Sequence, residues 1–110
     1  MITIEVEEQD GWQVLRVAGE VDLRTAPELR DRLNAVLAGG TERLVVDLED
    51  VTFLDSTALS VLIGAHKRLA RLGGALHLVT TRDQILRVLN ITGLSRVFAV
   101  HPTLEDAVGG

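Results

Sequence analysis

Apolar and polar residues alternate along the first part of the chain and then recur at a helical spacing. Residues 2–7 and 12–18 each alternate, as half-buried β-strands do. The turn signal Gln9-Asp10-Gly11 separates them, so they are predicted to form an antiparallel hairpin. Apolar residues then fall on one helical face, which predicts an amphipathic helix that buries Ala26, Leu29, Leu33, Val36 and Leu37.

Residues typical of helix termini mark the bounds of this first helix. Thr25 and Glu28 have the spacing of a capping box, in which each side chain binds a free backbone N–H of the other. Pro27 suits the first turn, where its missing N–H has no helical partner. Gly39-Gly40 predicts the end of the helix, because glycine readily adopts the left-handed conformation found there.

Strands and helices are predicted to alternate through the rest of the chain. Residues 44–48 form a nearly continuous apolar run, which is typical of a central strand covered on both faces. A helix is expected from Ser56 to about Leu72, ended by Gly73-Gly74. We expect its buried face to consist of Leu59, Leu62, Ile63, His66 or Leu69, and Ala70.

A third strand–helix pair and a short last pair complete the pattern. Residues 75–79 predict a strand, and Thr81 with Gln84 predicts a second capping box at the start of a helix. Ile85, Val88 and Leu89 would face inward before the break at Ile91-Thr92-Gly93-Leu94. A short strand at 97–100 and a helix at 102–108, followed by Gly109-Gly110, are the last predicted elements.

The order β-β-α-β-α-β-α-β-α predicts an α/β fold in one domain, residues 1–110. We expect a mixed β-sheet of about five strands, with an N-terminal antiparallel hairpin and right-handed crossovers through about four helices. No internal repeat or linker divides the chain.

Composition and charge exclude several classes of function. With no cysteine, the chain has neither a disulfide framework nor a thiolate metal site. A net charge of −5 argues against nucleic acid and anionic membranes as direct partners. Since no stretch resembles a signal peptide or a membrane span, we expect a soluble, cytoplasmic protein. No phosphate-binding glycine loop or close pair of histidines is present, so we expect no cofactor and no metal.

Two aspartates stand out because each lies between a predicted strand and a helix. Asp22 and Asp55 would follow strand ends that meet at one edge of the sheet, together with Ser56 and Thr57. The simplest interpretation is local, since aspartate, serine and threonine favour turns and helix N-caps. We expect Ser56 or Thr57 at or near the N-cap of its helix.

The sequence does not favour a hydrolase. Ser56 lacks the glycine-flanked G-x-S-x-G turn of serine hydrolases. His66 follows Thr57 by nine positions on the same helix, roughly 13 Å along the axis, which is too far for a general base.

The remaining possibility is that the hydroxyl of Ser56 or Thr57 is a phosphate acceptor. A phosphate at a helix start faces free N–H groups and the positive end of the helix dipole, so the fold should tolerate it.

Four blocks of the sequence resemble the STAS-domain family of anti-sigma factor antagonists. Gly19-Glu20-Val21-Asp22 with Ala26-Pro27-Glu28-Leu29 is similar to the family's first block. Residues 51–59, Val-Thr-Phe-Leu-Asp-Ser-Thr-Ala-Leu, resemble its phosphorylation loop. Gly73-Gly74-Ala75-Leu76 and Ile91-Thr92-Gly93-Leu94 resemble its later blocks. The resemblance spans nearly the whole chain, in order.

The resemblance implies a non-enzymatic switch. In its unphosphorylated form such an antagonist binds an anti-sigma factor serine kinase, which has a histidine-kinase-like ATPase fold, and thereby releases a sigma factor. Phosphorylation of the loop ends the binding, and a PP2C-type phosphatase reverses it. The implied acceptor is Ser56 or Thr57: position favours Thr57, and the serine preference of these kinases favours Ser56. The implied partner-binding residues are Asp22, Asp55, Ser56, Thr57, Ala58 and Ser60.

One departure and two alternatives accompany this interpretation. Ala58 and Ser60 stand where the family commonly has the glycines of a Gly-Leu-Gly pattern, and alanine favours a helix there. A first alternative is a STAS interaction module in another system, either a signalling scaffold or a lipid-transport accessory subunit. A second is an enzyme or a phospho-aspartate receiver using Asp55 or Asp22. Lys67, the only lysine, lies on the helix after the loop rather than at a strand end, which disfavours a receiver.

Overall fold

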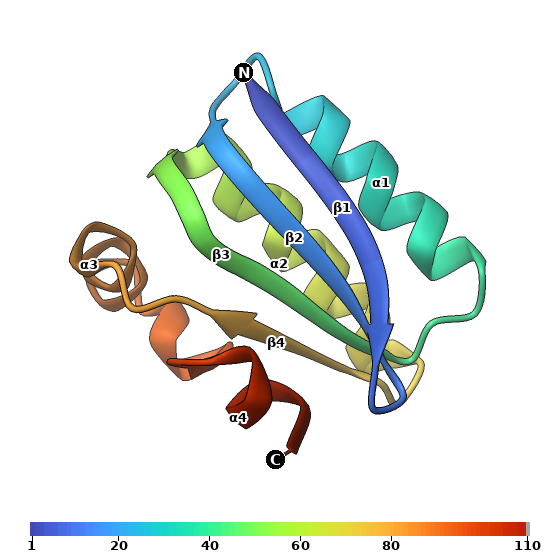
Figure 1. Cartoon of the computed structure of the whole chain (residues 1–110). Helices are drawn as coiled ribbons and strands as arrows, with labels where there is room; N and C mark the ends of the chain where they lie inside the picture. Colours follow the sequence, from blue (N-terminus) through green and yellow to red (C-terminus); the bar gives the residue numbers. More distant parts are fainter. Residues whose placement is uncertain (110) are drawn as a thin grey trace.

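One β-sheet, with its strands in sequence order β1-β2-β3-β4-β5, organises the computed structural model, which describes residues 1–109 (Figure 1). The strands are β1 (Ile2–Gln9), β2 (Trp12–Val21), β3 (Arg43–Leu54), β4 (Ala75–Val79) and β5 (Ala99–His101). The helices are α1 (Ala26–Ala38), α2 (Ser56–Arg71), α3 (Asp83–Ile91) and α4 (Leu104–Gly109), with a 3₁₀ turn η1 (Leu94–Arg96).

The pairing of the strands confirms the predicted mixed sheet of an α/β fold. β1 and β2 are antiparallel, as the short turn at Asp10 and Gly11 predicts, and the other neighbouring strands are parallel. Five strands and four α-helices are present in residues 1–109, as expected. Gly110, the last residue of the predicted domain and of its terminal glycine pair, lies outside the described residues.

The two faces of the sheet carry different cores. α1 and α2 cover one face and α4 lies across part of the other (Figure 1). The larger core, between the sheet and α1, α2 and α3, is almost wholly aliphatic, because the chain has only three aromatic residues to contribute. The smaller core, beneath α4, consists of Trp12, Val14, Val45, Val79, Ala107 and Val108.

Strand β3 is longer than the sequence predicts, and this places the loop that follows it. We expected a strand at 44–48, whereas β3 continues to Leu54 and pairs in parallel with the end of β2. The register shifts between Arg16 and Ala18 and again between Gly19 and Glu20, and it ends with Val21 opposite Leu54. Residues 51–54 therefore belong to the sheet, because the second half of β2 provides them with backbone partners.

Both predicted capping boxes are wrong, because other groups bind the threonine hydroxyls. Thr25 occupies the N-cap position of α1 but makes no capping bond. Its Oγ1 instead donates to the carbonyl oxygen of Glu20 at 2.7 Å and accepts from the N–H of Asp22 at 2.9 Å. The Oγ1 of Thr81 donates to Oε2 of Glu49 at 3.1 Å, and α3 begins after Arg82 without a side-chain cap.

The predicted inward faces of the helices are mostly correct, with a difference on α2. Ala70 is exposed, whereas Ala65 is buried on the inner face of α2.

The last strand begins at Ala99 rather than at residue 97, because Phe98 turns into the core. The ring of Phe98 lies 5.4 Å from the ring of His66.

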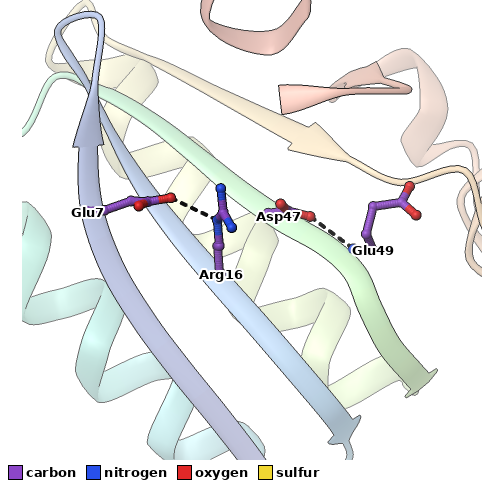
Figure 2. Close-up of polar contacts among 4 residues, drawn as sticks. All are labelled: Glu7, Arg16, Asp47 and Glu49. Atoms are coloured by element: carbon purple, nitrogen blue, oxygen red, sulfur yellow. Dashed lines mark hydrogen bonds and ion pairs between the residues drawn. The ribbon is translucent and has the colours of Figure 1, made fainter. Parts of the chain in front are cut away.

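The part of the second sheet face that α4 leaves uncovered is charged (Figure 2). Arg16 Nε and Glu7 Oε1 form an ion pair at 2.8 Å between β2 and β1. On β3, the Oδ1 of Asp47 accepts the N–H of Glu49 at 3.0 Å. Because the two side chains of the ion pair are 49% and 47% exposed, the pair contributes at most about 1 kcal/mol to stability.

Gly19 provides a test of how the end of β2 is held. Its φ of +103° is unfavourable for other residues, and a Cβ there would overlap the carbonyl oxygen of Met1. We expect Gly19→Ala to lower the free energy of unfolding by about 1–3 kcal/mol. Gly64→Ala is the control: its site on α2 is open, so alanine should stabilise the helix by about 0.5–1 kcal/mol. Equal urea midpoints for Gly19→Ala and the unsubstituted protein would contradict this account.

Candidate functional site

Asp55 is the residue that fixes the start of α2. Its Oδ1 accepts the N–H of Ala58 at 3.1 Å, which makes Asp55 the N-cap. Its own N–H donates to the carbonyl oxygen of Val21 at 3.2 Å, which ties the corner to the end of β2. Ser56 and Thr57 thus lie directly after the N-cap, near it as predicted, but neither caps the helix, because the extended backbone at Asp55 places a carboxylate over the first turn.

Neither hydroxyl residue that follows is needed for the cap, and the two differ in exposure. Ser56 is the first residue of α2 and is exposed. Thr57 is half-buried and borders a groove between α1 and α2. Ala58 is completely buried, whereas Ser60 is exposed and its hydroxyl donates to the carbonyl oxygen of Ser56 at 3.0 Å. Ser56 therefore presents its side chain at the surface of a helix start that Asp55 holds in place.

Asp22 organises the neighbouring turn. Its Oδ1 accepts the backbone N–H groups of Arg24 at 2.9 Å and Thr25 at 3.1 Å. The hydrogen bond from Thr25 is the main reason that the pKa of Asp22 lies below its ordinary value of 3.8, so this carboxyl is ionised at neutral pH. Since Val21 pairs with Leu54, the strand ends that precede Asp22 and Asp55 are neighbours. Both carboxylates thus lie at one edge of the sheet.

Two large apolar side chains, which the sequence analysis did not single out, are exposed in the same region. Leu23, next to Asp22, is 71% exposed, and Phe53, two residues before Asp55, is 49% exposed. Phe53 also borders a groove of about 260 Å³ beside Ile85 and Val88 of α3. Exposed apolar side chains around a polar centre are typical of protein-binding surfaces. The sequence could have indicated the exposure of Leu23, because this leucine lies in a predicted turn. Core residues rarely occupy turns.

The groove between α1 and α2 adjoins Thr57 and Ser60 and has a volume of about 360 Å³. Leu33, Leu37 and Val61 form part of its apolar lining, and Arg30 and Arg68 also line it. Arg68 Nη1 donates to Oδ1 of Asn34 at 3.4 Å, which links α2 to α1.

The three histidines pack against groups other than the two hydroxyls. His66 packs against Phe98, and the rings of His77 and His101 lie 4.8 Å apart at β4 and β5. Within residues 1–109, no three histidine, aspartate or glutamate side chains are grouped as metal ligands would be. In the same part of the chain, no helix has the length and apolarity that crossing a membrane requires. The chemistry that the site can support is modification of an exposed hydroxyl and contact with another protein.

Comparison with known proteins agrees with this geometry. The family model described as STAS domain matches residues 3–107. The anti-sigma-B factor antagonist of Bacillus subtilis (strain 168) is 32% identical over 107 residues, covering 97% of this chain and 97% of the relative. The anti-sigma-B factor antagonist of Staphylococcus aureus (strain NCTC 8325 / PS 47) is 35% identical over 104 residues, covering 94% and 96%. These relatives are named as regulators and not as enzymes.

Solved structures give the same result. The crystal structure of an anti-sigma factor antagonist from Mycobacterium paratuberculosis has a TM-score of 0.92 and 38% identity, covering 99% of this chain and 92% of that one. The unphosphorylated anti-sigma factor antagonist SpoIIAA, at 18% identity and a TM-score of 0.73, shares the fold. The resemblance inferred from the four sequence blocks is thus confirmed, and the chain belongs to the STAS domain family, where its named relatives are anti-sigma factor antagonists.

Proposed function

We propose that the protein is an anti-sigma factor antagonist controlled by phosphorylation of the Asp55-Ser56-Thr57 loop. In the unphosphorylated form it binds an anti-sigma factor serine kinase with a histidine-kinase-like ATPase fold, and a sigma factor is released. Phosphorylation by that kinase ends the complex, and a PP2C-type phosphatase restores the binding form. The observation that carries this proposal is the exposed hydroxyl of Ser56 at the start of a helix that Asp55 already caps.

Exposure favours Ser56 over Thr57 as the acceptor. A kinase must bring the γ-phosphate of ATP in line with the attacking oxygen, which requires a hydroxyl that protrudes from the surface. Ser56 is exposed, whereas the half-buried Thr57 lies against the α1–α2 groove. Modification of Thr57 would therefore require local movement of α2, and modification of Ser56 would not.

The same geometry explains how a phosphate would change the interface while preserving the fold. A phosphate on Ser56 lies at the positive end of the α2 dipole, near first-turn N–H groups that have no helical acceptor. It adds about −1.5 to −2 charge beside Asp55 and Asp22. A partner that covers the exposed side chains of Leu23 and Phe53 would then have to bury a dianion, at a large cost in desolvation. Binding is lost and folding is not.

The proposed docking surface is the edge of the sheet that carries Asp22, Asp55 and Ser56. It contains the predicted partner-binding residues, with one difference in role. Asp22, Asp55, Ser56, Thr57 and Ser60 lie at this surface, whereas Ala58 lies beneath it and acts by packing. In this proposal the protein works in the cytoplasm and contacts neither nucleic acid nor membrane directly.

A STAS interaction module in another system, a scaffold or a lipid-transport accessory subunit, remains the alternative. It would use the same exposed edge without a kinase.

A binding experiment distinguishes the two functions. Immobilised protein should retain a kinase of the histidine-kinase-like fold from a lysate of its source organism. Retention of transporter components in its place would favour the alternative.

Phosphate mapping tests the acceptor. Each purified serine kinase of this fold from the source organism is incubated with the protein and ATP, and the product is digested and analysed by mass spectrometry. We expect one phosphate, on Ser56, which Ser56→Ala abolishes and Thr57→Val leaves at more than about half of the original rate. A kinase that modifies another antagonist but leaves both Ser56 and Thr57 unmodified would refute the assignment.

A charged substitute for phosphate separates effects on binding from effects on the fold. We expect Ser56→Glu to weaken binding to the cognate kinase at least tenfold, equivalent to about 1.4 kcal/mol, as titration calorimetry would measure. Its thermal midpoint should stay within about 4 °C of the original, since a helix N-terminus tolerates an anion. Ser95→Glu, exposed on η1, is the control and should bind normally. Extensive unfolding of Ser56→Glu would contradict the claim that the fold accepts charge here.

A further inference from the structure

Three aromatic rings lie in a row on the sheet face beneath α4. The centroids of Trp12 and His77 are 4.6 Å apart, and those of His77 and His101 are 4.8 Å apart. The rings come from β2, β4 and β5, so the indole of Trp12 reaches across β3 to meet His77. Trp12 is only 6% exposed and belongs to the small core that α4 completes.

His77 binds α4 directly. Its Nδ1 lies 3.0 Å from the carbonyl oxygen of Ala107. Because a carbonyl oxygen can only accept, Nδ1 carries the proton in this contact. Ala107 is in the last turn of α4, where carbonyl groups have no helical partner, so the imidazole satisfies one of them. A helix of six residues is not stable by itself, and contacts such as this hold it in place.

His101 lies in a site that disfavours a charged ring. Its Nε2 is buried without a hydrogen-bond partner in the described residues. Burial, and then the proximity of His77, hold the pKa of His101 below its ordinary value of 6.5. Asp106 of α4 acts in the opposite direction, and Arg43 of β3 places its guanidinium carbon 6.0 Å from the Trp12 ring. A proton on Nε2 would have no acceptor, and the centroid of a second imidazole lies 4.8 Å from that of His101.

We propose that His77 and His101, stacked on Trp12 beneath α4, form a pH-sensitive latch that keeps α4 docked only while the imidazole of His101 is neutral. When α4 is released, the imidazole of His101 is free to take up a proton. Release also uncovers the apolar strip of Trp12, Val14, Val45 and Val79. The latch is separate from the Ser56 switch, because it lies beneath α4 and not at the start of α2.

The direction of the pH effect follows from proton linkage. The docked state holds His101 neutral, whereas in the released state its imidazole binds a proton as the pH falls below about 6.5. The docked state is therefore fully favoured above pH 6.5 and loses stability as the pH falls toward the lowered pKa. The equilibrium constant for release should rise by up to about tenfold per pH unit in this interval.

Hydrogen exchange of the α4 amides at pH 7.5 and 5.5, corrected for intrinsic rates, tests the latch in the full chain. In the unsubstituted protein we expect protection of residues 104–109 to fall about tenfold relative to α2 at pH 5.5. Trp12, the only tryptophan, gives a second measurement, because acrylamide should quench its fluorescence more strongly at pH 5.5. His101→Leu cannot take up a proton and should keep both measurements independent of pH.

Two further variants control the experiment. His66→Gln removes the histidine that packs on Phe98 and should retain the pH dependence of the unsubstituted protein. Asp106→Asn, at an exposed position, removes the charge that favours a protonated His101, so α4 should lose more protection at pH 5.5. Equal α4 protection at the two pH values, the same pH dependence in His101→Leu, or an unchanged response in Asp106→Asn would each overturn the proposal.

Discussion

The parallel ladder between β2 and β3 is the constraint on which the functional edge of this protein depends. It ends with Val21 opposite Leu54, and one further hydrogen bond, from Asp55 N–H to the carbonyl oxygen of Val21, extends it into the turn. Asp55 then caps α2 through Ala58. This chain of backbone contacts places the start of α2 beside the end of β2.

The polar groups at this edge have separate tasks. Asp55 and Asp22 bind backbone N–H groups and so hold the two turns, while Ser56 is left free of any capping role. This separation is what a switch requires, because a charge added at Ser56 removes none of the hydrogen bonds that define the corner. The exposed side chains of Leu23 and Phe53 contribute nothing to the main core, and in the proposed complex they would make the interface sensitive to the same charge.

The two sides of the sheet differ in how firmly they are held. The side covered by α1 and α2 has a continuous aliphatic core, and nine of its leucines are among the largest fully buried side chains. The other side has a small cluster beneath a six-residue helix, and two histidines contribute to it. We therefore expect the free energies of local opening to differ between the two sides, with α4 at the low end. The charged rest of this face, with Glu7 and Arg16, remains in water (Figure 2).

The sequence by itself determined the hairpin, the order of strands and helices, and the position of the Asp55-Ser56-Thr57 loop after a strand, because periodicity and glycine signals are local. The tertiary structure decided what depends on partners distant in sequence. β3 extends to Leu54 because β2 lies beside it, and Thr25 forms no cap because Glu20 and Asp22 bind its hydroxyl. Asp55, and not Ser56, caps α2, and His77 meets His101 and Ala107 only once β4, β5 and α4 are assembled. Local pattern predicts which elements form, whereas the geometry between elements decides which side chains remain free to act.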